Sequence, residues 1–301
     1  MKKYSFLILP YLLFGISALA QQRPDTTFIP NVTTSLFQKD SGPIICIDSA
    51  HNNLHTLNGG FAPFARLMRS VGFRVEDRNA IISDKTLLSG CDIYAIINSL
   101  YKSNLGNWRL PNPSAFTNQE ITEINEWVKE GGRLFLVADH MPFGGAAFEL
   151  AKSFGFEFSN GFARLEKEGN QPDYFSIENG RLLQQEFFGD EINSVTSFTG
   201  SAFTYPDEAN IIMKFKTEDV SLEPEIAWQF TDSTKTISLE NYAQGAVFEY
   251  GEGKILVFGE AAMFTAQKVR NQNGTFRVGF NSSNAPNNQL FIIRLMEYLV
   301  E

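Results

Sequence analysis

Short apolar runs alternate with helical patterns in the first half of the chain. Residues 43–48, 91–99 and 133–139 are continuous, largely β-branched or apolar runs, which is typical of strands buried on both faces of a parallel sheet. Residues 61–72 and 117–131 carry apolar residues at helical spacing and end in glycine. This order predicts an α/β fold with a mostly parallel, doubly wound sheet and right-handed crossovers.

The helix over 117–131 has clear start and stop signals. Thr117 and Glu120 have the spacing of a capping box, and Gly131 supplies the stop. A further helix is expected over "GGAAFELAKSFGF", and "QLFIIRLMEYLV" predicts a closing amphipathic helix. Residues 73–79 should form another extended piece.

Residues 156–245 do not follow this alternation of strands and helices, because turn residues are frequent and the short apolar runs look antiparallel. The runs are "SVTSFTG", "NIIMKFK" and "EIAWQF". We interpret this segment as an insertion or an extended edge of the sheet. A hairpin turning at 251–253 restores the α/β character, and the Asn-rich residues 271–288 are expected to form a loop. Residues 43–301 should therefore form a single α/β domain, preceded by a polar N-terminal arm over 21–42.

The first twenty residues, "MKKYSFLILPYLLFGISALA", combine two lysines, an apolar run and a small-residue site. This pattern predicts a secretory signal peptide over 1–20, cleaved after Ala20, and a periplasmic or secreted protein whose mature chain starts near Gln21. The alternative is a retained membrane anchor. After cleavage we expect no membrane insertion.

The charge of the chain argues against some partners. The formal net charge is −9, and removal of residues 1–20, which hold Lys2 and Lys3 but no acid, makes it −11. An acidic protein of this kind is a poor candidate for binding nucleic acid or anionic membrane surfaces. Hydrophobic residues make up 43% of the chain, which is enough for a packed core.

Cys46 and Cys91 are the only cysteines. They lie inside one expected strand and at the start of another, and parallel neighbouring strands would place them at different heights. We therefore expect two buried free thiols, with a disulfide as the alternative in an oxidising compartment.

Each of the three histidines follows an apolar run that ends in aspartate. Ligands of open α/β sheets bind outside the carboxyl ends of the strands, where the residues after each run should gather. These residues are Asp48, His51, Asn52, His55, Asn98, Asp139, His140, Gly144, Gly145 and Glu260. We expect them to line one crevice.

Three interpretations of this set remain open. Histidine and carboxylate side chains permit acid–base catalysis, with His51, His55, Asp139 and His140 as the catalytic candidates. The three histidines could instead hold a divalent metal such as zinc, although Asn52 and the nearby glycines indicate a loop at the HxxxH spacing. The third interpretation is a structural hydrogen-bond network. Asp48, Asn52, Asn98, Gly144, Gly145 and Glu260 are expected to bind or orient a ligand.

Gly144 and Gly145 open the helix directly after a strand. Their backbone N–H groups could bind an anion or a developing oxyanion. Equally, glycines serve tight strand-to-helix turns. The chain has no GxSxG, Walker, GxGxxG or CxxC motif.

Several blocks resemble an uncharacterised domain-of-unknown-function family related to class I glutamine amidotransferases. The blocks are "DSAHNNLHTLNGGFAPFARLM", "FTNQEITEINEWVKEGGRLFLVADHMPFGGAAFELA", "SVTSFTGSAF" and the closing "GEGKILVFGEAAMF…NNQLFIIRLMEYLV". The resemblance implies a flavodoxin-like three-layer sandwich. It does not imply Cys-dependent glutamine hydrolysis, because the place of the nucleophile reads Asp139-His140-Met141.

Two functions follow as expectations. One is an exported hydrolase that acts on a small or carbohydrate-like substrate, because no cofactor motif is present and water is available as co-substrate. The other is a non-catalytic module that binds a glycan or a protein partner in the same crevice.

Overall fold

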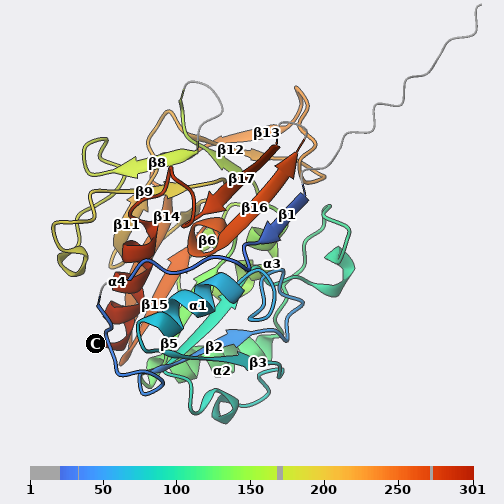
Figure 1. Ribbon diagram of the computed structural model, residues 1–301. Coiled ribbons are helices and arrows are strands. Elements are labelled where there is room, and N and C mark those ends of the chain that lie inside the picture. The colour runs from blue at the N-terminus through green and yellow to red at the C-terminus, as the bar shows by residue number, and fades with distance from the viewer. Residues whose placement is uncertain (1–20, 33, 168–171, 272–273) are drawn as a thin grey trace, which may run out of the picture.

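The computed structural model describes residues 21–32, 34–167, 172–271 and 274–301 (Figure 1). The expected signal peptide over 1–20 lies outside these residues. Within them, no helix has both the length and the apolar character needed to cross a membrane.

A nine-stranded mixed sheet forms the centre of the molecule. Eight strands follow the order β3-β2-β4-β5-β15-β14-β10-β6, and β11 also pairs with β14. Their bounds are β2 Ile44–Asp48, β3 Arg74–Arg78, β4 Ile93–Ile97, β5 Arg133–Val137, β6 Glu157–Phe158, β10 Phe203–Thr204, β11 Asn210–Lys214, β14 Ala243–Tyr250 and β15 Gly253–Phe258.

Half of this sheet is parallel and half is antiparallel. The pairs from β3 through β15 are parallel, whereas β15 pairs with β14 in the expected hairpin and the strands beyond are also antiparallel. The expectation of a mostly parallel sheet is therefore corrected to a mixed sheet. The reason is that strands from the 156–245 segment continue the central sheet at one side.

Four helices pack on the two faces of the sheet (Figure 1). Their bounds are α1 Ala62–Ser70, α2 Asn118–Lys129, α3 Phe143–Lys152 and α4 Asn288–Val300. Alternate strand residues point to opposite faces. Ile45 and Ile47 join the apolar cluster that includes α1 and α4, and Cys46 joins the cluster that includes α2 and α3.

Helix ends occur where the sequence predicts them. Thr117 and Glu120 form a complete capping box at the start of α2. Gly72 and Gly131 follow α1 and α2 with φ of +100° and +109°, a conformation that glycine adopts at little cost. The described residues also contain four short 3₁₀ helices: η1 Lys85–Leu88, η2 Lys102–Asn104, η3 Glu186–Phe188 and η4 Ala262–Phe264.

Three small antiparallel sheets lie beside the central sheet. They are β7-β12-β13, β8-β9 and β1-β16-β17. The strand bounds are β1 Gln21–Pro24, β7 Phe162–Arg164, β8 Asp173–Ser176, β9 Ser194–Ser197, β12 Val220–Glu223, β13 Lys235–Ser238, β16 Ala266–Asn271 and β17 Gly274–Gly279.

The small sheets correct three local predictions. The N-terminal arm begins with strand β1, and the expected loop over 271–288 contains strand β17. The run "EIAWQF" is not a strand, because it contributes only an isolated bridge at Ile226 and leaves Trp228 54% exposed. "SVTSFTG" and "NIIMKFK" do contain strands, β9 and β11.

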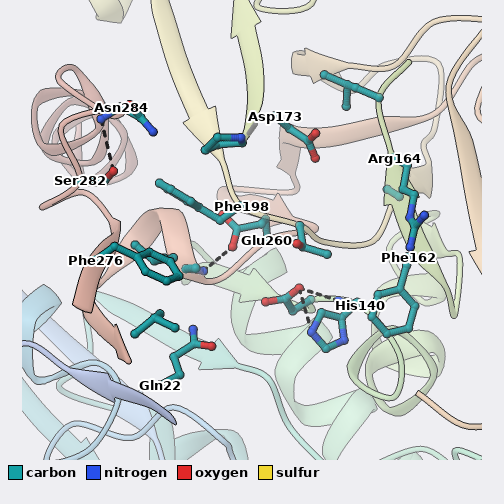
Figure 2. A pocket seen from close by; sticks show the side chains of 18 of the residues that line it. Gln22, His140, Phe162, Arg164, Asp173, Phe198, Glu260, Phe276, Ser282 and Asn284 are labelled. Atoms are coloured by element: carbon teal, nitrogen blue, oxygen red, sulfur yellow. Dashed lines mark hydrogen bonds and ion pairs between the residues drawn. The ribbon is translucent and has the colours of Figure 1, made fainter. Parts of the chain in front are cut away.

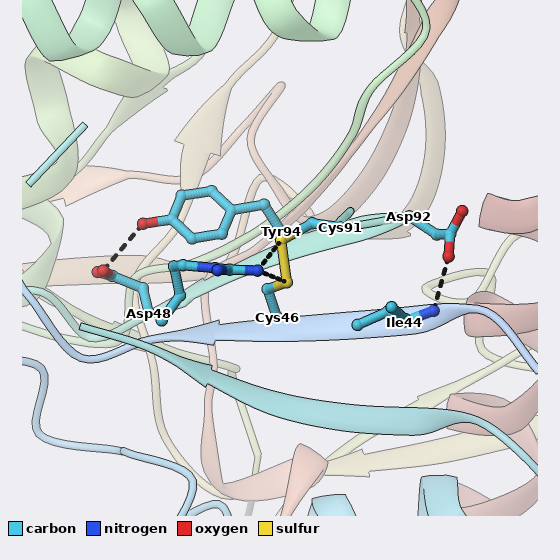
Figure 3. The surroundings of a disulfide bond; sticks show 7 residues. Ile44, Cys46, Asp48, Cys91, Asp92 and Tyr94 are labelled. Atoms are coloured by element: carbon cyan, nitrogen blue, oxygen red, sulfur yellow. Dashed lines mark hydrogen bonds between the residues drawn. A yellow bond between two sulfur atoms is a disulfide. The ribbon is translucent and has the colours of Figure 1, made fainter. Parts of the chain in front are cut away.

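Cys46 and Cys91 form a disulfide, so the expectation of two free thiols is wrong (Figure 3). Cys91 precedes β4 in a turn after η1 and does not follow the register of that strand. Its Cα therefore lies 5.6 Å from that of Cys46. Nη2 of Arg78 lies 3.2 Å from each sulfur.

Candidate functional site

The carboxyl ends of four parallel strands meet at one edge of the sheet, in the order β2, β4, β5, β15. Asp48 ends β2, Asn98 follows β4, and Asp139 and Glu260 come two residues after β5 and β15. The strand order thus confirms that these residues share an edge. Their side chains nevertheless divide into two separate groups, one around His51 and one around His140.

The group around His51 is an enclosed ion network. Nδ1 of His51 lies 2.8 Å from Oδ2 of Asp48, and Nε2 lies 2.8 Å from Oε1 of Glu120. The hydroxyl of Tyr94 donates to the other oxygen of Asp48 at 2.9 Å. The side chains of His51, Asp48 and Glu120 are at most 3% exposed. No ring nitrogen is left for a substrate, which favours a structural role for His51.

The pKa shifts of His51 and Glu120 agree with a structural role for His51. Burial by itself would lower the pKa of His51, but the Asp48 and Glu120 carboxylates outweigh it and raise the pKa above its ordinary value. The pKa of Glu120 is lowered, because hydrogen bonds from Thr117 and the contact with His51 outweigh the effect of burial. The charged imidazole therefore ties the loop after β2 to the start of α2.

His55 lies apart from both groups. Its ring contacts Phe61 at 5.5 Å between centroids, and its Nδ1 is enclosed with no hydrogen-bond partner. Burial of the ring lowers its pKa to about 4. His55 does not line the cavity beside His140, so the expectation that all three imidazoles share one crevice is wrong.

A cavity of about 790 Å³ lies beside His140 (Figure 2). Three buried polar residues at the carboxyl ends of β5 and β15 line it, Asp139, His140 and Glu260, at 8%, 8% and 1% exposed, and we call them the floor. Strand β7, the loop with Trp228, strand β17 and the segment 282–284 form the walls.

The two carboxyl groups of the floor are electrostatically linked. Burial raises the pKa of Asp139 above its ordinary value. Burial and the nearby charge of Asp139 together raise the pKa of Glu260 well above its own. Glu260 accepts backbone N–H groups of Ala262 at 2.6 Å and Met263 at 2.8 Å. Such a pair retains a proton to a higher pH than an isolated carboxyl group.

His140 is held at the floor by backbone and aromatic contacts. Its Nδ1 donates to the carbonyl of Met141 at 2.8 Å, which leaves Nε2 as the nitrogen that can take up or deliver a proton. Nε2 lies 4.0 Å from Oδ1 of Asp139. Phe162 stacks on the ring at 4.5 Å and Trp228 meets it edge-on at 4.7 Å.

The remaining predicted ligand-binding residues have structural partners. Oδ1 of Asn98 accepts the backbone N–H of Asp139 at 2.9 Å, and Asn52 donates to the carbonyl of Leu100. Asn98 therefore positions the floor, and neither asparagine lines the cavity.

The two glycines of α3 also lie outside the cavity lining. The N–H of Gly145 donates to Asn160, and a Cβ on Gly144 would lie 2.6 Å from the carbonyl oxygen of Ser159. Close packing against the backbone thus accounts for Gly144, and Gly145 already has a hydrogen-bond acceptor. The anion-binding interpretation has no support at these two positions.

The donor set does not fit the zinc site considered from the sequence. Over the described ranges, no group of three or more His, Cys, Asp or Glu side chains could hold a metal ion. Both ring nitrogens of His51 are already bonded to carboxylates, and Nδ1 of His55 is enclosed. The three imidazoles therefore do not converge on one ion.

Sequence reasoning missed most of the cavity walls. Phe162, Arg164, Asp173, Trp228 and Arg277 all line the cavity, yet they come from three small sheets and a loop. Trp228 offered one usable signal, because it is a tryptophan within a segment rich in polar and turn residues. No pattern of spacing links the other four to His140.

No protein-family model and no curated protein matches the chain. Among solved structures, the mmIFT52 N-terminal domain is similar with a TM-score of 0.59 and 13% identity, over 85% of this chain and 97% of that one. A putative ThuA-like protein from Bacteroides uniformis has a TM-score of 0.48 and 9% identity, over 90% and 94%. A cytoplasmic protein, STM3548 from Salmonella typhimurium, has 0.46 and 11%, over 85% and 98%. At these identities the first likeness shows a shared α/β fold alone, and the other two carry no argument about function.

Proposed function

We propose that this protein is a hydrolase whose active site is the cavity floored by Asp139, His140 and Glu260. The observation that carries the proposal is a linked pair of buried carboxyl groups, both with raised pKa, beside a histidine with a free Nε2. Perturbed titrating groups in a cavity at a strand edge are typical of catalytic sites.

The residues support acid–base cleavage of a C–O bond. Water attacks the electrophilic carbon of the substrate, and Nε2 of His140 takes the proton of that water. The bond to the leaving oxygen breaks, and that oxygen receives the proton retained on the Asp139–Glu260 pair. One water is consumed, and proton exchange between His140 and the pair restores the starting state.

The walls favour a small, carbohydrate-like substrate. A volume of about 790 Å³ accommodates one or two sugar rings by the usual size of ligand pockets. Trp228, which is 54% exposed, presents aromatic surface, while Asp173, Ser282 and Asn284 offer hydrogen-bonding groups. An aromatic ring that packs against the face of a sugar, with polar groups beside it, suits a carbohydrate-like ligand.

The test is turnover of a panel of esters and glycosides by the wild type and by His140→Gln. We expect at least a 100-fold loss of activity, because proton transfer by a positioned histidine contributes on that order. The melting temperature should change by no more than a few degrees. Lys129→Gln, an exposed change on α2 away from the cavity, is the matched control and should keep full activity.

A binding module without catalysis is the second candidate. It is favoured by the backbone hydrogen bonds that occupy both oxygens of Glu260 and by its 1% exposure. Binding of a glycan without turnover on the whole panel, with His140→Gln altering affinity alone, would support the module and overturn the hydrolase.

We also propose export and a three-layer sandwich related to class I glutamine amidotransferases. The pattern of residues 1–20 supports export, and the Cys46–Cys91 disulfide suits an oxidising compartment. Helices on both faces of the sheet support the sandwich. Fractionation of cells that express the full chain, with N-terminal sequencing of the product, tests export and cleavage after Ala20.

A further inference from the structure

The cavity is acidic at its floor and basic at its mouth. Among the exposed side chains that line the cavity, we call Arg164, Trp228, Phe276 and Arg277 the mouth. Arg164 comes from β7 and Arg277 from β17, so the two cations enter from different sheets. The chain has a net charge of −9. The presence of two arginines at the opening of a cavity with an acidic floor therefore requires a physical explanation.

Arg164 has no carboxylate partner among the described residues, and Arg277 shares one carboxylate, that of Asp25, with Lys268. The guanidinium of Arg164 lies 4.7 Å from the ring centroid of Phe230 and has no ion pair within the described part of the chain. Nε of Arg277 lies 3.8 Å from Asp25, whose other oxygen is 2.8 Å from Lys268, and the Arg277 side chain is 62% exposed. The guanidinium groups of both arginines therefore keep N–H donors available at the mouth.

The acidic residues of the lining do not compete for these cations. Asp173 pairs with Lys167, and the two floor carboxyls are held by backbone N–H groups of the segment 261–263 and of His140. The negative groups are thus deep and engaged, whereas the positive groups are outermost. Figure 2 shows Arg164 above Phe162, on the side of the cavity opposite Phe276.

Trp228 gives the mouth an aromatic surface that reaches the floor. It is 54% exposed, yet its ring meets Phe162 at 4.6 Å and His140 at 4.7 Å between centroids. Its backbone has a φ of +68°, which is unfavourable for a bulky residue. Such strained conformations persist at ligand clamps, where the surrounding contacts hold them.

We propose that the cavity selects a ligand with a sugar-like ring and an anionic substituent, a carboxylate or a sulfate. Arg164 on β7 and Arg277 on β17 attract the anionic group to the mouth, and Trp228 packs against the ring. The neutral end of the ligand then faces Asp139, His140 and Glu260, where a second negative charge would be repelled. This inference rests on the proposed function for the location of the site, but not on turnover.

The test is calorimetric titration of the full chain with matched probes at low and high salt. The probes are a glucuronate disaccharide, a sulfated disaccharide and their neutral counterpart. We expect at least tenfold tighter binding of a charged probe than of the neutral one, with the difference reduced by salt. Whichever charged probe binds better identifies the carboxylate or the sulfate as the anion.

Variants separate the two parts of the site. Arg164→Gln and Arg277→Gln should each weaken binding of the charged probe about tenfold and leave the neutral probe unchanged. Trp228→Ala should weaken both probes. Lys129→Gln removes the same charge from α2, away from the cavity, and should change neither.

The outcomes distinguish this inference from the hydrolase. Preferred binding of a charged probe without turnover would sustain the anion site and reject the hydrolase. Turnover with no preference for charge, or arginine variants that bind like the wild type, would overturn the anion site and leave the hydrolase standing. Failure of every probe to bind also overturns it.

Discussion

The three histidines show how much the surroundings of one residue type decide what it can do. His51 lies between two carboxylates, Nδ1 of His55 is enclosed without a hydrogen-bond partner, and His140 keeps Nε2 at a cavity. The same imidazole is thus a structural cation, a neutral packed ring and a candidate proton carrier.

His51 should make the stability of the protein depend on pH. Its folded-state pKa is raised above 6.5, so its contribution is complete below pH 6.5 and is lost as the pH rises through the folded value. We expect His51→Gln to cost about 3 kcal/mol near pH 6, because it leaves two buried carboxylates without their partner. Urea unfolding at pH 6 and pH 9 measures the difference, which should be smaller at pH 9.

His55 provides the contrasting case for this measurement. Burial lowers its pKa to about 4, so protonation favours the unfolded chain and stability falls as the pH drops below 6.5. His55→Gln should reduce that fall. If both variants shifted the free energy of unfolding equally at every pH, neither assignment of protonation would hold.

At the scale of elements, the start of α2 connects a local signal with a distant contact. Glu120 completes the capping box with Thr117 and also holds Nε2 of His51. The capping box was predictable because its members are three residues apart. The contact with His51 was not, since 69 residues separate the two partners.

Thr117→Ala should lower the free energy of unfolding by about 1 kcal/mol, the usual cost of losing an N-cap side chain. The Thr117 hydroxyl accepts the N–H of Glu120 at 3.3 Å and donates to its carboxylate at 2.9 Å. Thr122→Ala is the matched control, because Thr122 is exposed in the same helix and should change stability by less than about 0.5 kcal/mol. Equal effects in urea unfolding would contradict a special role of the cap.

Strand prediction succeeded where burial is strong and failed where it is weak. β2, β4 and β5 are continuous apolar runs that are almost fully buried. β17 was missed because its first four residues, a glycine followed by threonine, phenylalanine and arginine, are all exposed, so no apolar alternation marks it. The prediction of a strand at "EIAWQF" was wrong because the apolar side chains of this run pack in a loop. Ala227 and Phe230 join a small apolar cluster there with Met141 and Phe162.

At the scale of the whole molecule, the disulfide joins β2 to the turn before β4 across 45 residues. Closure of a loop of that length lowers the entropy of the unfolded chain, which corresponds to about 4 kcal/mol in the chain-entropy account. The double variant Cys46→Ala, Cys91→Ala should lose stability on this order in urea unfolding. Reductant should weaken the wild type similarly and leave the double variant unchanged; an unaffected wild type would contradict the prediction.

The cavity is also a property of the whole molecule. Its floor comes from the ends of β5 and β15, and its walls come from β7, β17 and the loop with Trp228. Asp139, His140 and Glu260 were identifiable because each directly follows a recognisable buried strand. Arg164 and Arg277 were not, because their place at the mouth depends on how the small sheets pack against the large one.

The sequence by itself determined the buried strands, the ends of the helices, the acidic charge and the edge where polar residues gather. Those features depend on neighbours within a few residues, whose spacing is visible along the chain. Only the tertiary structure decided that the histidines separate, that the two cysteines join, and that distant arginines and a tryptophan line the same cavity as Asp139 and His140. These contacts arise when packed sheets bring remote segments together, and no local interaction specifies which remote segments meet.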